Sequence, residues 1–271
     1  MQAPFCRDCF TGTLRGDITP VGTEQTVHNL PSYVSLPPEG ARSLGTVVII
    51  TDAFGWKLRN TRVLADAYAR RVPCTVVVPD FHKGTSLTEK FLILADALPT
   101  ANMFTKIWTY VRVVPELVRF LLYNRYAVAA PRVNAFFHSL RQELGPSGKI
   151  GVAGFCWGGL YTIRLTHMSP PLVNCAFTAH PSLISVPADI DKVKDDTPLS
   201  IANGDDDQYL RRAKMETVVK MLRDRERHEV VVYEGAKHGF AVRGDIGDPK
   251  QKERGQGSED QAVGWFGRWM A

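Results

Sequence analysis

The fold is decided by one stretch of the sequence, Lys149-Ile150-Gly151-Val152-Ala153-Gly154-Phe155-Cys156-Trp157-Gly158-Gly159. Its apolar first half predicts a buried strand, and its glycines predict a sharp turn into a helix. This is the pattern of a nucleophile elbow, in which the neighbours of the nucleophile must be nearly bare. Cys156 would then lie at the N-terminus of a helix, where backbone N–H groups and the helix dipole favour a thiolate. A buried cysteine beside packing glycines is the structural alternative.

A cysteine nucleophile needs a histidine base and an acid that orients it. In the elbow fold these follow in the order nucleophile, acid, histidine. One apolar run ends in the acidic loop 204–210, and a later one ends at His238. Both positions lie just past the carboxyl ends of predicted strands, where open α/β sheets build their sites. A solvated turn is the alternative interpretation for Asp205 and Asp206.

Five motifs along the chain belong together: Asp52-Ala53-Phe54-Gly55, Pro79-Asp80, Gly154-Phe155-Cys156-Trp157-Gly158-Gly159, Gly204-x-x-Asp207 and Gly235-Ala236-Lys237-His238-Gly239-Phe240. With them the chain, from about Thr46 to its C-terminus, resembles the dienelactone hydrolase family, a branch of the α/β-hydrolases with a Cys-Asp-His triad. The resemblance implies an α/β-hydrolase fold, a doubly wound and mostly parallel sheet flanked by helices. It also implies the triad Cys156, Asp207 and His238, in which Asp207 ends the Gly-x-x-Asp pattern. Asp206 is the alternative acid.

The loop after the first core strand carries further candidates. In the family a glutamate here pairs with the cysteine and regulates its ionisation, and the matching residue is Asp52. An aspartate is one methylene shorter, so either the backbone lies closer to Cys156 or the contact is weaker or water-mediated. A helix N-cap is the other interpretation of Asp52. As an oxyanion hole, the elbow offers the backbone N–H of Trp157 and the loop offers that of Ala53.

Phe54, His180 and Arg243 are candidates for residues that line the substrate. His180 ends a predicted strand on the side where the triad collects. Arg243 corresponds to an arginine that pairs with a substrate carboxylate in relatives, although its spacing from His238 is one residue longer here.

The reaction that the resemblance implies is hydrolysis of an ester or enol-lactone in two steps. Cys156 attacks the carbonyl, and water activated by His238 releases the acid from the acyl-thioester. An alternative is a lactone-opening, cyclisation or isomerisation enzyme of secondary metabolism without net hydrolysis. A redox sensor is a further alternative, but an obvious resolving cysteine is missing.

Composition fits one domain over residues 1–271: 44% of the residues are hydrophobic, enough for a sizeable core. No apolar run approaches the ~18 residues of a membrane span, and the N-terminal residues lack the pattern of a secretory signal. We therefore expect a cytoplasmic protein without a membrane partner. The net charge of +5 comes from scattered residues, and its densest stretch, 250–254, is predicted to be a polar loop. Nucleic-acid binding is not expected, whereas the mild positive field would help an anionic small molecule to arrive.

Five cysteines without a regular framework agree with a reducing compartment. Cys6 and Cys9 form a Cys-x-x-Cys without a second pair, so no metal site is expected there. Cys74 and Cys175 lie in apolar segments and are predicted to be core residues. No cofactor is expected, and the chain is expected to be a monomer or a homodimer.

Strands are predicted over 26–36, 46–50, 75–78, 149–153, 175–179, 199–202 and 229–233. An apolar helix face is predicted at Val63, Leu64, Ala67 and Tyr68, and a closing helix at Ala262, Phe266, Trp269 and Met270. Between them, residues 84–147 are expected to form a helical excursion that covers the active site. Helical patches at 91–98 and 117–123 would be punctuated by Pro99, Pro115 and Pro131. Aromatic residues of this excursion would line a pocket or belong to the core: Phe104, Trp108, Tyr110, Phe136 and Phe137.

Overall fold

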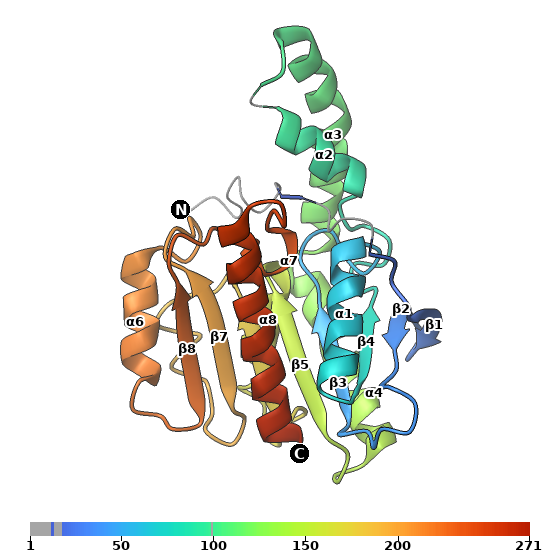
Figure 1. The fold of residues 1–271 in the computed structure, drawn as a ribbon, viewed down its shortest axis with the longest axis vertical. Helices are drawn as coiled ribbons and strands as arrows, with labels where there is room; N and C mark the ends of the chain where they lie inside the picture. Colours follow the sequence, from blue (N-terminus) through green and yellow to red (C-terminus); the bar gives the residue numbers. More distant parts are fainter. Residues whose placement is uncertain (1–11, 14–17, 99) are drawn as a thin grey trace.

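The computed structural model describes residues 12–13, 18–98 and 100–271. It contains a single eight-stranded sheet with helices on both faces (Figure 1). The strands are β1 (Thr23–Val27), β2 (Leu30–Ser35), β3 (Thr46–Ile50), β4 (Thr75–Pro79), β5 (Ile150–Phe155), β6 (Cys175–Ala179), β7 (Leu199–Gly204) and β8 (His228–Tyr233). The helices are α1 (Arg59–Arg71), α2 (Glu89–Ala97), α3 (Met103–Tyr123), α4 (Tyr126–Leu144), α5 (Trp157–Leu165), α6 (Arg212–Leu222), α7 (Phe240–Arg243) and α8 (Pro249–Met270).

The order of the strands is β1-β2-β4-β3-β5-β6-β7-β8. The strands from β4 to β8 in this order run parallel, and β2 and β1 extend the sheet antiparallel at one edge. Helices α1 and α8 lie side by side on one face of the sheet, and α4 and α5 lie on the other (Figure 1). The predicted doubly wound, mostly parallel α/β-hydrolase fold is therefore confirmed.

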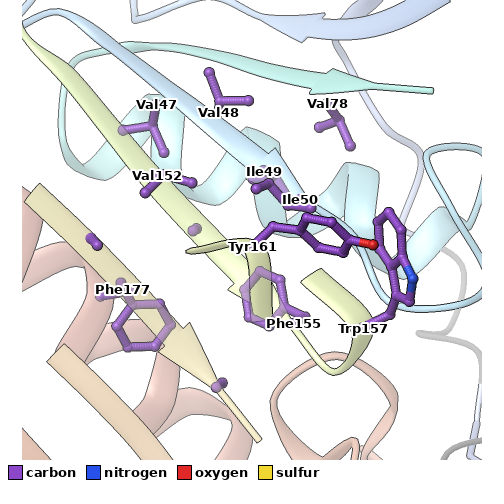
Figure 2. Close-up of a cluster of buried hydrophobic side chains, with 14 of the residues drawn as sticks. Val47, Val48, Ile49, Ile50, Val78, Val152, Phe155, Trp157, Tyr161 and Phe177 are labelled. Atoms are coloured by element: carbon purple, nitrogen blue, oxygen red, sulfur yellow. The ribbon is translucent and has the colours of Figure 1, made fainter. Parts of the chain in front are cut away.

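The core is built on continuous apolar strands, as a sheet covered on both faces requires. Four consecutive residues of β3, from Val47 to Ile50, are completely buried. Figure 2 shows these side chains with those of Phe155 and Phe177 in one cluster. The predicted core cysteines, Cys74 and Cys175, are also completely buried. This rigid core fixes the carboxyl ends of the parallel strands, where the candidate residues lie.

The predicted single strand over 26–36 is wrong, because the segment forms a hairpin of β1 and β2. His28 and Asn29 form the turn, with φ values of 46° and 64°. Two consecutive left-handed residues match the right-handed twist of a hairpin, and asparagine tolerates this conformation well. A polar pair inside a β-rich run was the available signal.

The predicted polar loop at 250–254 is also wrong, because these residues form the first turns of α8. The Asp248 side chain caps this helix by accepting hydrogen bonds from the N–H groups of Lys250 and Gln251, and Pro249 occupies the first turn. The predicted closing helix itself is confirmed: Ala262, Phe266 and Met270 are buried, and Trp269 is half-buried. The predicted apolar face of α1 is buried as well.

The segment from 84 to 147 divides into two parts. Helix α4 packs on the body, with Phe136 and Phe137 buried in the core. Helices α2 and α3, which we call the arm, project beyond the edge of the sheet toward which β5 points (Figure 1). That the arm covers the active site stays a prediction.

Proline residues do not end the helices of this segment as predicted. Pro115 lies inside α3 and Pro131 inside α4, while Pro99 lies outside the described residues. Phe104, Trp108 and Tyr110 of α3 are exposed. Among the described residues, no helix combines the length and the apolar character that crossing a membrane requires.

Candidate active site

Cys156 lies in a sharp turn between β5 and α5, with φ 50° and ψ −110°. A Cβ atom at Gly158 would lie 2.0 Å from the backbone oxygen of Ile50, and one at Gly154 would lie 2.1 Å from Oγ1 of Thr162. These contacts are far too short for any side chain. The two glycines therefore answer the steric demand that the sequence predicted, and they let the elbow place Cys156 at the start of α5.

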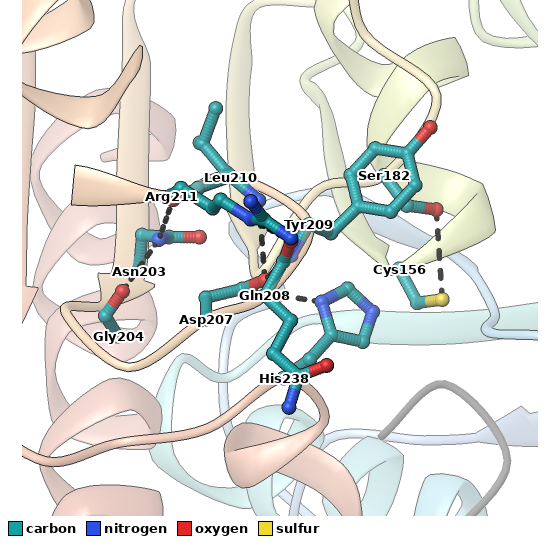
Figure 3. A network of polar contacts seen from close by, with 10 residues as sticks. All are labelled: Cys156, Ser182, Asn203, Gly204, Asp207, Gln208, Tyr209, Leu210, Arg211 and His238. Atoms are coloured by element: carbon teal, nitrogen blue, oxygen red, sulfur yellow. Dashed lines mark hydrogen bonds and ion pairs between the residues drawn. The ribbon is translucent and has the colours of Figure 1, made fainter. Parts of the chain in front are cut away.

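Asp207 and His238 come from the loops after β7 and β8, and the structure brings them together. Oδ2 of Asp207 lies 2.9 Å from Nδ1 of His238, and both side chains are buried (Figure 3). Oδ1 of Asp207 accepts hydrogen bonds from the N–H groups of Tyr209 (2.7 Å) and Leu210 (3.2 Å). These bonds fix the carboxylate in place. The alternative acid, Asp206, has an exposed side chain.

The other ring nitrogen of His238 lies on the side of Cys156 (Figure 3). Burial by itself would lower the pKa of His238, but the charges and hydrogen bonds of Asp207 and Cys156 outweigh it and hold this pKa well above its ordinary value. The geometry therefore favours an imidazolium between the carboxylate and the sulfur atom. A cationic ring beside a cysteine supports a thiolate.

Ser182 is a residue of the site that the sequence did not single out. Its hydroxyl oxygen lies 3.6 Å from Sγ of Cys156, and its backbone N–H donates a 2.9 Å hydrogen bond to the carbonyl oxygen of Cys156 (Figure 3). The residue is completely buried. It lies in the loop after β6, two positions beyond His180. The one available signal was that this loop follows a strand at the same edge of the sheet.

Asp52 lies two residues after the end of β3 and is buried beside the elbow. Its carboxylate accepts hydrogen bonds from the N–H of Phe54 (3.0 Å) and from Nε of Arg243 (2.8 Å). Burial raises the pKa of Asp52, the charge of Arg243 lowers it and that of Cys156 raises it, and the net result is a raised pKa. The interpretation of Asp52 as a helix N-cap is wrong, because Leu58 occupies the N-cap position of α1.

Arg243 is held between an acid and a ring. Besides its ion pair with Asp52, its guanidinium group lies 5.1 Å from the centre of the Phe54 ring. Phe54 in turn packs edge-on against Phe91 of α2. The structure thus brings these two predicted lining residues together with the predicted thiol-modulating residue, Asp52, in one buried cluster.

The two predicted oxyanion donors lie at the ends of neighbouring strands. Ala53 follows β3 and Trp157 follows β5, and these strands are paired up to Ile50 and Gly154. Among the described residues, neither backbone N–H donates a hydrogen bond. The indole Nε1 of Trp157 donates a 3.0 Å hydrogen bond to the carbonyl oxygen of Asn124, which caps the C-terminal end of α3.

His180 is completely buried, and its ring centre lies 5.0 Å from that of His238 in an edge-to-face arrangement. Burial, together with the charges of His238 and Arg243, lowers its pKa well below the ordinary value. Within the described residues, neither ring nitrogen has a hydrogen-bond partner. The ring is therefore neutral and packs against the catalytic histidine candidate.

A cavity of about 320 Å³ opens beside His238. Its walls include Lys237, Arg243 and Arg254, which are opposed by Asp248 alone among the acidic residues of the lining. The described residues contain no group of three or more side chains that could hold a metal ion. Cys6 and Cys9 lie outside the described residues.

A family model described as "Dienelactone hydrolase family" matches residues 30–270 of the chain. Among curated proteins, the chain is similar to hydrolase pyvD of Aspergillus violaceofuscus, with 27% identity over 262 residues that cover 96% of this chain and 92% of the relative. It is also similar to a human carboxymethylenebutenolidase homolog, with 26% identity over 92% of each chain.

Among solved structures, a dienelactone hydrolase from Anabaena variabilis has the same fold. The TM-score is 0.55, with 15% sequence identity over 92% of this chain and 97% of that one. At this identity the likeness concerns the fold alone.

Proposed function

Because the chain belongs to the dienelactone hydrolase family, we propose that it hydrolyses a small ester or enol-lactone through a triad of Cys156, Asp207 and His238. The relatives named as hydrolases and butenolidases support the reaction class, ester or lactone hydrolysis. The observation that carries the triad is the buried line from Asp207 through His238 to the side of Cys156.

In the first step, the thiolate of Cys156 attacks the carbonyl carbon of the substrate. The raised pKa of His238 favours its protonated form in the resting enzyme, and this ring would donate its proton to the leaving oxygen as the C–O bond breaks. Asp207 keeps the ring oriented and stabilises its positive charge. The product of this step is an acyl-thioester on Cys156.

The tetrahedral intermediate carries a negative oxygen, which the N–H groups of Ala53 and Trp157 would bind. Both groups are without partners among the described residues; Ala53 lies in the loop after β3, Trp157 begins α5, and both residues are completely buried. Donors that are fixed before the reaction cost no reorganisation when the charge develops.

In the second step, His238 has lost its proton and acts as a base toward water. His238 takes a proton from water, the resulting hydroxide attacks the thioester, and the C–S bond breaks. This restores the thiolate and the protonated His238, and it releases the acid. An enol leaving group suits this mechanism, because a thiolate adduct reverts easily unless the other oxygen leaves first. The basic residues of the cavity beside His238 suit a substrate or product that carries a carboxylate.

Ser182 and Asp52 would tune the resting thiol from two sides. The Ser182 hydroxyl can donate to Sγ across 3.6 Å, which stabilises a thiolate. Asp52 acts in the opposite direction by its charge, but its ion pair with Arg243 reduces that effect. These two opposed effects on the thiol would take the place of the regulation by the family's glutamate, whose longer side chain would reach further toward the sulfur atom.

The first test compares wild type with Cys156→Ala on an activated aryl ester and a small panel of enol-lactones. We expect kcat/KM to fall at least about 10⁴-fold in the variant, because the nucleophile is lost. Intact-protein mass spectrometry should find an acyl adduct in wild type that is missing in the variant. Cys6→Ala and Cys9→Ala are the controls and should remain active.

Full activity of Cys156→Ala would overturn the mechanism. Lack of turnover in wild type, with Cys156 still open to a small alkylating agent, would instead favour the non-hydrolytic alternative. A product that differs from the substrate by the mass of one water identifies hydrolysis, and an unchanged mass identifies isomerisation.

A further inference from the structure

The arm carries an apolar stripe that the proposed reaction does not use. The stripe runs along α3 and comprises Phe104, Trp108, Val111, Pro115, Val118 and Leu122. All six residues are exposed, with exposed fractions of 72% for Phe104, 52% for Trp108 and 61% for Val111. A monomeric protein rarely exposes so many large apolar side chains in one place.

The spacing of the stripe is that of a helix which pairs with another helix. Its members follow one another at intervals of 4, 3, 4, 3 and 4 residues, which is the a/d repeat of a coiled coil. The first and last members are 18 residues apart in sequence, or about 27 Å along the helix. The opposite side of α3 is already used, because Val113 and Phe120 are buried there and α2 packs on the helix.

The stripe is complementary to itself when it is reversed. Its bulkiest members, Phe104 and Trp108, lie toward the N-terminal end, and smaller side chains lie toward the other end. In an antiparallel pair centred between Val111 and Pro115, Phe104 of one helix faces Leu122 of the other. Trp108 then faces Val118, so that each large side chain meets a smaller one, as close packing requires. Antiparallel pairing also places the two helix dipoles favourably.

The exposed apolar area is sufficient for a stable dimer. Ile107 and Val114 widen the stripe on one flank, and they are also exposed. Aromatic side chains offer about 150–250 Å² each when fully buried. The stripe and these two flank residues together present on the order of 800 Å² per copy, and a standard interface uses about 800 Å² per partner.

A membrane surface fits the charges less well. A helix that lies on anionic lipid carries basic residues along both sides of its apolar face. Here Arg112 and Arg119 each follow a stripe member, Val111 and Val118, and so share one flank, while the other flank carries Ile107 and Val114. An apolar flank widens a contact with a second helix.

We propose that the stripe is the interface of a homodimer, in which two copies of this chain pair antiparallel along α3. The arm then projects from the body because its apolar surface is completed by the partner's arm. Each active site is built from residues of its own chain.

Sedimentation over a micromolar concentration range tests the interface. Wild type should be a dimer, and Trp108→Glu/Val111→Glu should raise the dimer dissociation constant at least about 30-fold, because charges are buried at the centre of the contact. Leu36→Glu, at an exposed apolar position after β2, is the matched control and should remain a dimer. A wild-type monomer, or a double variant that dimerises like wild type, would overturn the proposal.

Cross-linking tests the direction of pairing without relying on a disruptive variant. In a background with Cys6→Ser and Cys9→Ser, a mixture of Phe104→Cys and Leu122→Cys proteins should form an interchain disulfide under copper–phenanthroline oxidation. Phe104→Cys alone should not, because its two thiols would lie at opposite ends of the pair. Faster cross-linking of Phe104→Cys with itself would refute the antiparallel arrangement, and no interchain disulfide in any mixture would refute the interface.

Vesicles that contain anionic lipid test the competing occupant. We expect wild type not to sediment with them. Co-sedimentation that the Trp108→Glu/Val111→Glu variant loses would assign the stripe to a lipid surface and overturn the dimer.

Discussion

The catalytic edge of the sheet and the arm differ in which side chains they bury and which they expose. At the edge, the polar groups of Asp52, Asp207 and His238 are buried and paired. On the arm, large apolar groups such as Phe104 and Trp108 are exposed. Burying a polar group is unfavourable unless it is paired, and exposing many large apolar groups is unfavourable unless another surface covers them. At the catalytic edge, the cost of burying polar groups is offset by partners within the same chain, which indicates a reactive site. On the arm, the cost of exposing apolar groups is not offset within the chain, which indicates a surface for a partner.

The largest effect should come from the acid at the edge. Asp207→Asn removes the charge that holds His238 in orientation, and we expect kcat to fall about 10³- to 10⁴-fold. Asp206→Asn, the neighbouring change at an exposed side chain, should change kcat less than about twofold. Steady-state kinetics on the activated ester measures both. If kcat fell equally in the two variants, the assignment of the buried Asp207 rather than the exposed Asp206 as the triad acid would be wrong.

One substitution made in both regions compares them directly. Phe137→Ala in the core should lower the free energy of unfolding by about 3–5 kcal/mol, because it leaves a cavity. Phe104→Ala on the arm should change it by less than about 0.5 kcal/mol. Urea unfolding at low protein concentration, where a dimer contributes least, gives both values. A large loss at Phe104 under these conditions would show that the arm is packed within a single chain.

A smaller effect is expected at Ser182, which acts through Cys156. Ser182→Ala removes a hydroxyl that lies 3.6 Å from Sγ, and we expect kcat/KM to fall about tenfold, in line with the loss of one hydrogen bond to a charged group. The rate of Cys156 alkylation should then rise with pH later than in wild type. An unchanged pH profile with reduced activity would indicate a merely structural role.

The smallest effect should be on how the free energy of unfolding changes with pH. The neighbouring rings of His180 and His238 contribute to this pH dependence with opposite signs. His180 has a lowered pKa, so its neutral ring contributes stability above pH 6.5 that is lost as the pH falls and the unfolded chain takes up a proton. His238 has a raised pKa, so its contribution is complete below pH 6.5 and is lost as the pH rises through the folded pKa. His180→Phe should therefore reduce the acid-side loss only. Urea unfolding at several pH values tests this, and an unchanged acid-side slope would contradict it.

Much of the edge could be predicted from the sequence, because its constraints are local. The glycines around Cys156 and the endings of β7 and β8 are each visible within about ten residues of sequence. Ser182 was missed because it reaches Cys156 from 26 positions away, and no local pattern marks such a contact. The pairing of Asp52 with Arg243 spans 191 positions and was likewise invisible.

The prediction of the fold was good for continuously buried strands. It was less good where a single turn or cap residue determines where a helix or strand begins or ends. The turn at His28 and Asn29 split a predicted strand, and the cap at Asp248 turned a predicted loop into a helix. On the arm, the apolar residues of α3 were assigned to a pocket or the core. Periodicity shows which residues share a face, but not whether that face meets the same chain or another one.

Trp157 connects the two regions. Its backbone N–H is one of the two proposed oxyanion donors, and its indole donates the 3.0 Å hydrogen bond to the carbonyl oxygen of Asn124, the C-cap residue of α3. Trp157 therefore contacts both the base of the arm and the oxyanion site, so that a movement of this residue would displace both. In terms of linkage, if binding that favours one arm position changes the affinity for a tetrahedral-state analogue by a factor α, the analogue changes the affinity at the arm by the same α.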